Sequence, residues 1–316
     1  MTRTTPGASE TGGRHTGEQH TGAQAVDRQA VDVHCHVFSA DGAGPTPTVL
    51  DAAYRPPRAD VADHRRHLDA VRCGRGVLVQ PSAYGRDHRC LLAALRSGSD
   101  RLRGVACVDP GWADEDLARM HAAGVRGTRV QDGYPGGVPV ESLVEVGRKV
   151  APLGWHVEVW TDVRRHVSWF GDAVRRCPVP VVVDHLGYVP SDVGTGDPAV
   201  RLLLDLLADG EIWMTLSGLD RLLPGSGAPG DPGFDERWRR HEDAVTERVR
   251  AFVDARPEQV LWGSDWPHVG LRLPAPDSAR IRARLDRWVP DPDLRRRILV
   301  DNAVRRYDFG TAPAVP

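Results

Sequence analysis

Three histidines and one aspartate stand where they could carry out chemistry together. His34 and His36 belong to the segment VDVHCHVF. His185 follows the apolar run PVPVVVD, and Asp265 lies in VLWGSDWPH. In an extended strand, residues two apart share a face, so His34 and His36 converge while Cys35 points away. Imidazoles grouped in this way can ligate a divalent cation or donate hydrogen bonds to a substrate oxygen, and a carboxylate beside them can accept a proton from water.

Short strands and amphipathic helices alternate from Val31 onward and would position these side chains. The β-branched runs that read as strands are 31–36, 76–80, 104–108, 125–130, 155–160, 179–184, 212–216 and 259–262. The segments that read as helices are 60–73, 87–97, 113–123, 138–153, 163–177, 198–208, 236–255 and 276–289. Eight such repeats predict a single (β/α)8 TIM barrel, whose active sites lie at the carboxyl ends of the strands. A doubly wound sheet is the alternative, but no GxGxxG or GxxxxGK[ST] follows the first strand.

Residues 1–29 differ from the rest of the chain. They are rich in Thr, Gly, His and Gln and show no apolar periodicity, which predicts a disordered tail. We expect one catalytic domain over residues 30–312.

Charge and hydropathy argue against several classes of protein. Lys+Arg 41 and Asp+Glu 43 give a formal net charge of −2, so the chain lacks a basic field for nucleic acid. No apolar run approaches the roughly 18 residues of a membrane-spanning helix, and no apolar signal segment opens the chain. The five cysteines never form a CxxC pair, which favours reduced thiols. These features predict a cytoplasmic protein that binds neither nucleic acid nor membrane.

Five motifs, in order along the chain, resemble the amidohydrolase superfamily: DVHCHVF, QPSAYG, GVRGTR, DHLG and GSDWPH. They are most similar to its 2-pyrone-4,6-dicarboxylate lactonase-like branch, over residues 31–309. The resemblance implies that the three histidines surround the substrate carbonyl, or a metal in metal-using relatives, and that the strand-eight aspartate is the general base. The residues that match these roles are His34, His36, His185 and Asp265. The branch places substrate contacts at Tyr54, Ser82, Arg129 and Arg221, and His268, three residues after Asp265, is a further candidate.

Three features depart from the pattern of that branch. A second arginine is expected soon after the strand-four arginine, where this chain reads QDGYPGG. Trp160 stands near the place of the strand-five tyrosine, and His88 replaces the asparagine expected after QPSxYGxD. These positions recognise substrate, so the departures argue against a dicarboxylated pyrone and leave hydrolysis as the expected reaction.

The resemblance also bears on metal. Relatives with two metal ions bridge them by a carboxylated lysine or a glutamate at the end of strand four, where this chain reads GVRGTRVQ. Lys149, the single lysine, is about five helical turns further on. His156 opens the fifth strand and should face the opposite end of the barrel. We therefore expect no binuclear centre and no required cofactor. One Zn²⁺ or other divalent cation, held by the three histidines and Asp265, is the alternative.

These residues predict a hydrolase that opens a carboxylated lactone by attack of water. Asp265 would be the general base, the three histidines would polarise the carbonyl, and the partner would be a small anionic cyclic molecule. A mononuclear metal-dependent decarboxylase and a non-catalytic ligand-binding barrel are the alternatives. A serine hydrolase is not supported, because GxSxG is absent. The sequence leaves the substrate and the oligomeric state open.

Overall fold

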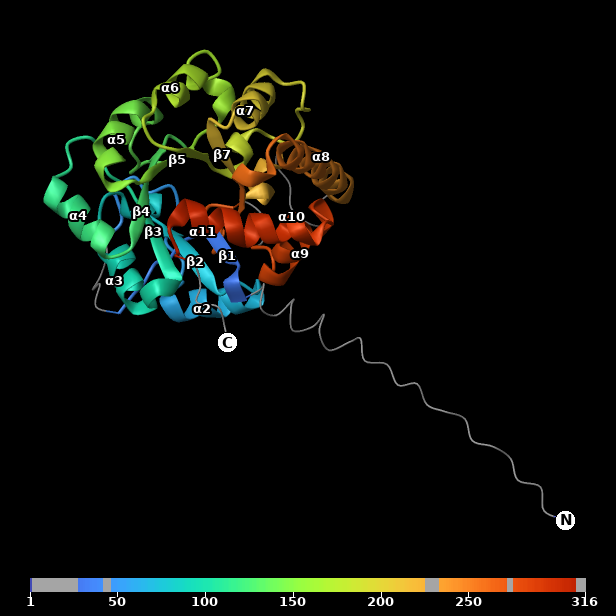
Figure 1. Ribbon diagram of the computed structural model, residues 1–316, viewed down its shortest axis with the longest axis horizontal. Coiled ribbons are helices and arrows are strands. Elements are labelled where there is room, and N and C mark those ends of the chain that lie inside the picture. Colours follow the sequence, from blue (N-terminus) through green and yellow to red (C-terminus); the bar gives the residue numbers. More distant parts are fainter. Residues whose placement is uncertain (2–27, 42–46, 225–232, 272–274, 311–316) are drawn as a thin grey trace.

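Eight parallel strands follow one another around a barrel in chain order (Figure 1). The computed structural model describes residues 1, 28–41, 47–224, 233–271 and 275–310. The strands are β1 (Val31–Cys35), β2 (Arg75–Val79), β3 (Leu102–Ala106), β4 (Val125–Gln131), β5 (His156–Trp160), β6 (Val181–Val183), β7 (Ile212–Leu216) and β8 (Val260–Trp262). The predicted TIM barrel is confirmed, and each predicted strand lies within two residues of an observed one. Residues 2–27 of the predicted tail and 311–312 of the predicted domain lie outside the described residues.

Helices surround the barrel and cover its outer face (Figure 1). They are α2 (Val61–Ala70), α3 (Arg89–Gly98), α4 (Asp114–Ala122), α5 (Leu143–Val150), α6 (Phe170–Arg176), α7 (Pro198–Ala208), α8 (Phe234–Ala255) and α9 (Ser278–Trp288). Two predicted helices are shorter than expected. Around α5, the ends of the predicted span 138–153 are 3₁₀ turns, Val140–Ser142 and Ala151–Leu153, and Pro152, which lacks a backbone donor, lies where α5 ends. Before α6, Asp162 caps a separate 3₁₀ turn, and the chain then leaves helical geometry at His166.

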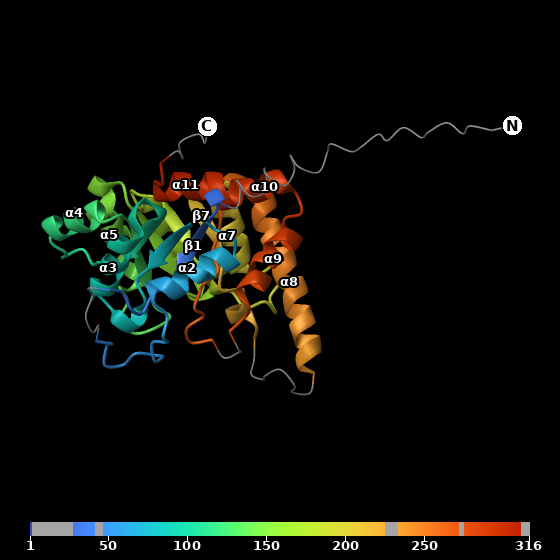
Figure 2. The ribbon, with the colours of Figure 1, turned by 90° about the horizontal axis from the view of Figure 1, so that it is seen from below.

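Three further helical segments, which the sequence reading missed, close the amino end of the barrel. They are α10 (Pro292–Arg296), a π-helical turn (Arg297–Asp301) and α11 (Asn302–Tyr307). Tyr307 and Phe309 pack against barrel-lining valines that include Val31 and Val33. Figure 2 shows α10 and α11 at one end of the barrel and the loop that follows β1 at the other. Because the amino end is filled, a substrate pocket has to open at the carboxyl end.

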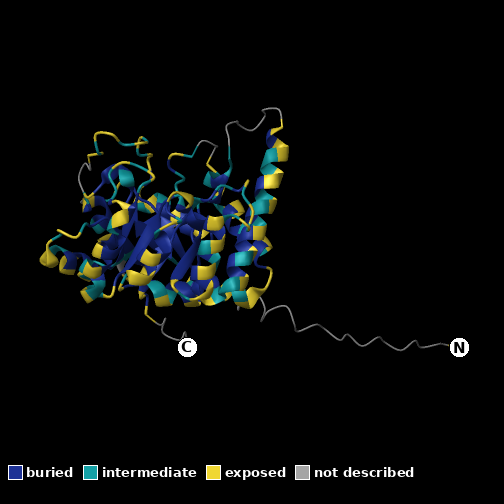
Figure 3. Cartoon of the chain, turned by 90° about the horizontal axis from the view of Figure 1, so that it is seen from above, coloured by how far each residue is buried: buried dark blue, intermediate teal, exposed yellow. Residues whose placement is uncertain are grey.

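Burial follows this architecture: the strands are buried and the exposed surface lies on the outer helices and loops (Figure 3). All five cysteines are free, and four of them are buried. In the part of the chain that the structure describes, no helix is both long and apolar enough to cross a membrane.

A bulge in β1 decides which of its side chains enter the barrel. Asp32 pairs with Gly76 and Cys35 pairs with Leu78, so three steps along β1 face two along β2. Val33 packs inside the barrel, and after the bulge His34 also turns inward, toward β6. Strict alternation would place Asp32 on the inner face with His34. Instead Asp32 alternates with Val31 and Val33, so its carboxylate faces outward and meets His67 of the outer helix α2, and the bulge after it re-aims His34.

His88 is a buried neutral acceptor, and it gives the fold a pH dependence. Its Nε2 accepts a hydrogen bond from the Cys107 amide at 3.0 Å, and burial lowers its pKa from 6.5 to about 4. Between these values the unfolded chain binds more protons than the folded chain, so stability falls as the pH falls. A shift of this size corresponds to roughly 2 kcal/mol at pH 5.

We therefore expect His88→Gln, whose amide oxygen can accept the same hydrogen bond, to gain stability relative to the wild type as the pH drops from 7 to 5. Urea unfolding at both pH values measures this difference. An equal loss of unfolding free energy in both proteins would show that His88 does not carry the effect.

Candidate active site

The side chains singled out in the sequence meet at the carboxyl end of the barrel. The Oδ1 atom of Asp265 lies 3.9 Å from His34 Nε2 and 3.7 Å from His36 Nε2. The rings of His34 and His185 have centroids 4.7 Å apart. All four residues are at most 4% exposed. Strands β1, β6 and β8 thus deliver three imidazoles and one carboxylate to one small volume.

Left-handed backbone turns aim two of these side chains. His185 has φ 53° directly after β6, and Asp265 has φ 65° shortly after β8. Such conformations cost a non-glycine residue free energy and occur at functional sites where the surroundings enforce them. Behind His185, a Cβ on Gly218 would lie 2.5 Å from His185 Nδ1, so a larger residue there would displace the imidazole. The turns after β6 and β7 are therefore shaped around His185.

Asp265 is ionised because of Arg221. Burial alone would raise the pKa of Asp265, but the Arg221 guanidinium, together with the imidazoles of the site, outweighs burial and holds this pKa well below its usual range. Arg221 Nε donates to Asp265 Oδ2 at 2.6 Å, and its NH1 donates to the Val269 carbonyl at 2.7 Å. Asp265 therefore presents its other oxygen, Oδ1, to His34 and His36.

Asp184 is a site residue that the sequence reading missed. Its Oδ1 lies 3.5 Å from His34 Nδ1 and its Oδ2 lies 3.8 Å from Arg129 Nε. Burial alone would lower the pKa of His34, but the Asp184 carboxylate outweighs this and raises it. Asp184 thus favours a cationic His34 whose Nε2 can donate into the site. The signal was available, since Asp184 directly precedes His185 at the same strand end.

The other two histidines have different hydrogen-bonding capacities. His36 Nδ1 lies 2.8 Å from the Val79 carbonyl, which only accepts, so this nitrogen carries the proton. Burial lowers the pKa of His36, so its Nε2 presents a lone pair to the site. His185 Nδ1 pairs with the Ser217 hydroxyl at 2.8 Å. When that hydroxyl donates, His185 Nε2 carries a proton that points away from Ser217 and can be donated.

A pocket of about 260 Å³, including its opening to solvent, lies beside these groups. Its lining contains every predicted substrate contact except one. The lining residues are His36, Tyr54, Ser82, Arg129, Tyr134, Trp160, His185, Arg221, Asp265 and Val269. The Ser82 and Tyr54 hydroxyls are 3.4 Å apart, and the Arg129 guanidinium stacks over Trp160 at 4.9 Å. The pocket therefore combines aromatic walls with cationic groups.

Arg221 and His268, both predicted to contact the substrate, are held by other protein groups. Arg221 lines the pocket, but its guanidinium already binds Asp265 and the Val269 carbonyl. His268 lines a neighbouring cavity with Leu271 and Ile281, because the hydrogen bond from His268 N to the Asp265 carbonyl closes a turn between them. The sequence motifs predict neither the ion pair of Arg221 with Asp265 nor the position of His268 outside the pocket.

The donor set of His34, His185 and Asp265 fits one divalent cation. Ligand atoms of His34, His185 and Asp265 all lie within 4.8 Å of one another, and neither ring nitrogen of His34 has a hydrogen-bond partner. A second cation would need a bridging ligand after β4. Lys149 instead pairs with Asp114 on the outside, and His156 contacts Glu158 near Tyr307, toward the closed end. His34, His185 and Asp265 thus offer the ligands of a mononuclear site.

Comparisons with known proteins agree with this geometry. The chain is 31% identical over 278 residues to a 2-pyrone-4,6-dicarboxylate hydrolase of Comamonas testosteroni, an alignment that covers 87% of this chain and 88% of that protein. It is 29% identical over 283 residues to a 4-sulfomuconolactone hydrolase of Rhizobium radiobacter, covering 87% and 88%. A solved structure of a putative 2-pyrone-4,6-dicarboxylic acid hydrolase from Pseudomonas putida superimposes with a TM-score of 0.76 at 28% identity, covering 90% of this chain and 99% of that one. A family model described as Amidohydrolase matches residues 31–309. The chain belongs to the amidohydrolase family.

Proposed function

We propose that this protein is a hydrolase that opens a lactone carrying a single acidic group. The observation that carries the proposal is the meeting of an ionised carboxylate, Asp265, with three imidazoles beside a cationic, aromatic pocket. A protein that only binds a ligand does not need a buried carboxylate held as an anion next to the ligand. Hydrolase names among the relatives support the same reaction class.

The hydrogen bonds and charges in the site give each residue a separate role in lactone hydrolysis. Cationic His34 and the Nε2 proton of His185 polarise the lactone carbonyl and stabilise the oxyanion, an interaction worth roughly 3–4 kcal/mol for each preorganised donor. Asp265 Oδ1 accepts a proton from the attacking water, because Oδ2 is held by Arg221. The lone pair on His36 Nε2 can accept a hydrogen bond from that water and orient it.

The proton is returned in the second step. When the tetrahedral intermediate collapses, the bond from the carbonyl carbon to the ring oxygen breaks, and the proton on Asp265 passes to that oxygen. Because Arg221 strongly favours the ionised form of Asp265, this carboxylate releases the proton readily. The net reaction is addition of water to give an open-chain hydroxy acid.

Charge in the pocket supports a substrate with one anionic group. Of its two arginines, Arg221 is bound to Asp265, whereas Arg129 lies 3.8 Å from the Asp184 carboxylate and stacks on Trp160. Arg129 is therefore the group that binds a carboxylate or sulfonate of the substrate. A second anion would have to compete with Asp265 for Arg221.

A panel of lactones tests the proposal. Five- and six-membered lactones with no, one and two acidic groups are incubated with the protein, and ring opening is followed by chromatography. We expect turnover of monoanionic lactones with the highest kcat/KM. Failure to open any of them, despite saturable binding, would identify a ligand-binding barrel.

The role of metal is tested separately. A cation held by His34, His185 and Asp265 would act as a Lewis acid on the carbonyl. We propose that the protein groups suffice, because His34 and His185 already supply donors at this place. We therefore expect protein treated with a strong chelator, and shown by elemental analysis to be metal-free, to keep its lactonase rate. Loss of activity with restoration by stoichiometric Zn²⁺ would contradict this. Release of CO₂ from an aromatic acid by the metal-loaded protein would favour the decarboxylase.

A further inference from the structure

The barrel closes between β8 and β1 through a few contacts rather than a regular ladder. In the described part of the chain, the segment after β8 meets β1 at one isolated bridge, between Trp266 and Cys35. The Asp265 amide donates to the His34 carbonyl at 2.9 Å, and the His36 amide donates to the Trp266 carbonyl at 2.8 Å. We call this contact between β1 and the segment after β8 the seam. Asp265 lies on one side of the seam, and His34 and His36 lie on the other. The geometry of the seam therefore sets the distances from Asp265 to His34 and His36.

A buried carboxylate takes the place of a backbone acceptor at this seam. Asp32 Oδ1 accepts a hydrogen bond from the Ser264 amide at 2.9 Å and one from the His34 amide at 3.3 Å. The Ser264 amide belongs to the residue directly before Asp265. The other amide is that of His34 itself, on the opposite side of the seam. Asp32 is fully buried and reaches the seam because it alternates with Val31 and Val33, which face the barrel interior, so that its side chain points to the outer helices.

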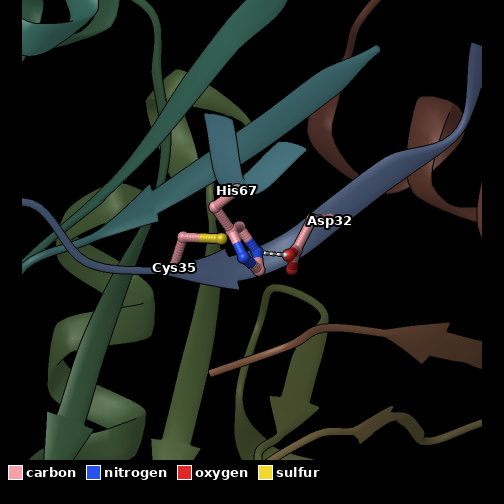
Figure 4. Close-up of side chains that lie close together, drawn as sticks. All are labelled: Asp32, Cys35 and His67. Carbon is pink, nitrogen blue, oxygen red and sulfur yellow. Dashed lines mark hydrogen bonds and ion pairs between the residues drawn. The ribbon is translucent and has the colours of Figure 1, made fainter. Parts of the chain in front are cut away.

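His67 fixes this carboxylate from outside the barrel. Figure 4 shows its ring beside Asp32, with Cys35 on the same side of β1. His67 Nε2 lies 2.9 Å from Asp32 Oδ2 and 2.9 Å from the Ser264 hydroxyl. Its Nδ1 lies 2.9 Å from the Ser278 hydroxyl at the start of α9, and its ring stacks on Trp266 at 5.3 Å. Helices α2 and α9 are thus tied to the turn that presents Asp265.

The cluster is complete without a metal ion. Asp32, Cys35 and His67 are ligand types, but both ring nitrogens of His67 and both oxygens of Asp32 already have protein partners. The Ser264 hydroxyl in addition accepts from the Trp266 amide at 3.0 Å. Hydrogen bonds therefore hold the residues immediately before and after Asp265, whose left-handed φ needs such support.

We propose that Asp32 and His67 are a positioning pair that holds the turn Ser264–Trp266 so that Asp265 Oδ1 stays within reach of the water that attacks the lactone carbonyl. This inference rests on the proposed function, since it assigns the pair to the general base of that reaction. Neither residue lines the pocket, so the pair acts on kcat and not on substrate binding.

Substitutions at His67 and at its neighbour His64 test the pair. His67→Phe keeps a ring against Trp266 and removes both hydrogen bonds, whereas His67→Gln keeps an amide that can donate to Asp32. His64→Phe is the matched control: His64 is fully buried in α2, its ring lies 6.4 Å from that of His67, and its nitrogens have no hydrogen-bond partner. For each variant, kcat and KM are measured on the best lactone of the panel, with the folded fraction taken from circular dichroism.

We expect His67→Phe to lower kcat about 30-fold with KM within about 2-fold, because a displaced base loses part of a contribution of 10²–10⁴-fold. His67→Gln should recover most of the rate, and His64→Phe should keep it. If kcat per folded molecule is the same for His67→Phe and His64→Phe, or if KM carries the change, the pair has no positioning role.

Ser264→Ala provides a second test that does not depend on the folding of His67→Phe. It removes only the hydroxyl that contacts His67 Nε2 and the Trp266 amide. We expect kcat to fall about 10-fold while KM stays the same. This loss is a smaller part of the general-base contribution than the loss expected for His67→Phe. An unchanged kcat would contradict the proposal.

The two proposals fail separately. If the wild type opens no lactone, the proposed function fails, and the distance from Asp265 to the histidines in a crystal structure of His67→Phe still tests the positioning. If the wild type is active and Asp265→Asn is not, but the His67 and Ser264 variants keep full kcat, only the positioning inference fails.

Discussion

Asp265→Asn is expected to lower kcat for lactone opening by about 10³-fold while KM changes little, the loss expected for removal of a positioned general base. Asparagine is isosteric, and its oxygen can still accept from Arg221 Nε, so the pocket keeps its shape. Its amide cannot accept a proton from water, which removes the first step of the proposed reaction. Steady-state kinetics measure kcat and KM, and a binding titration measures the affinity for the substrate independently.

Asp132→Asn is the matched control for this change. Asp132 lies just after β4 at the same end of the barrel, where its carboxylate pairs with His166 at 2.9 Å, and it does not line the pocket. The same chemical change there should leave kcat nearly unchanged. A kcat for Asp265→Asn within about 3-fold of the wild type would exclude Asp265 as the base.

Arg129→Gln is expected to lower kcat/KM for a monoanionic lactone by about 10²-fold, mainly through KM. A charge-assisted hydrogen bond to a carboxylate is worth roughly 1.5–3 kcal/mol, and glutamine keeps the polarity without the charge. A neutral lactone of the same ring size should lose much less, because it has no anion for Arg129 to bind. The ratio of the two substrates therefore isolates the electrostatic contact.

Arg126→Gln serves as the control for this substitution. Arg126 lies in the same strand, β4, but its guanidinium pairs with Asp308 at 3.0 Å on the surface. It should leave both substrates unaffected. An equal loss of kcat/KM for neutral and anionic lactones in Arg129→Gln would instead assign Arg129 to the support of Asp184 and His34.

Local patterns made much of the fold predictable. β-branched runs alternating with amphipathic segments indicate strands and helices through contacts within a few residues, and eight such repeats favour a barrel. The barrel then explains why His34, His185 and Asp265 could be grouped from sequence, since carboxyl ends of parallel strands share one rim. The terminal helix α11 was missed, because the apolar residues that identify it as a plug, Ala303 and Tyr307, are buried only against the barrel interior.

What the sequence by itself determined is the class of chemistry: three imidazoles, one carboxylate and a set of pocket residues at strand ends. What only the tertiary structure decided is how these groups are charged and held. Three contacts that decide this join residues far apart in the chain: Arg221 with Asp265, Asp184 with His34, and Asp32 with His67. Periodicity reports which face a side chain occupies, but a single bulge reverses that face. Partners and pKa shifts depend on distances of a few ångströms that only packing sets.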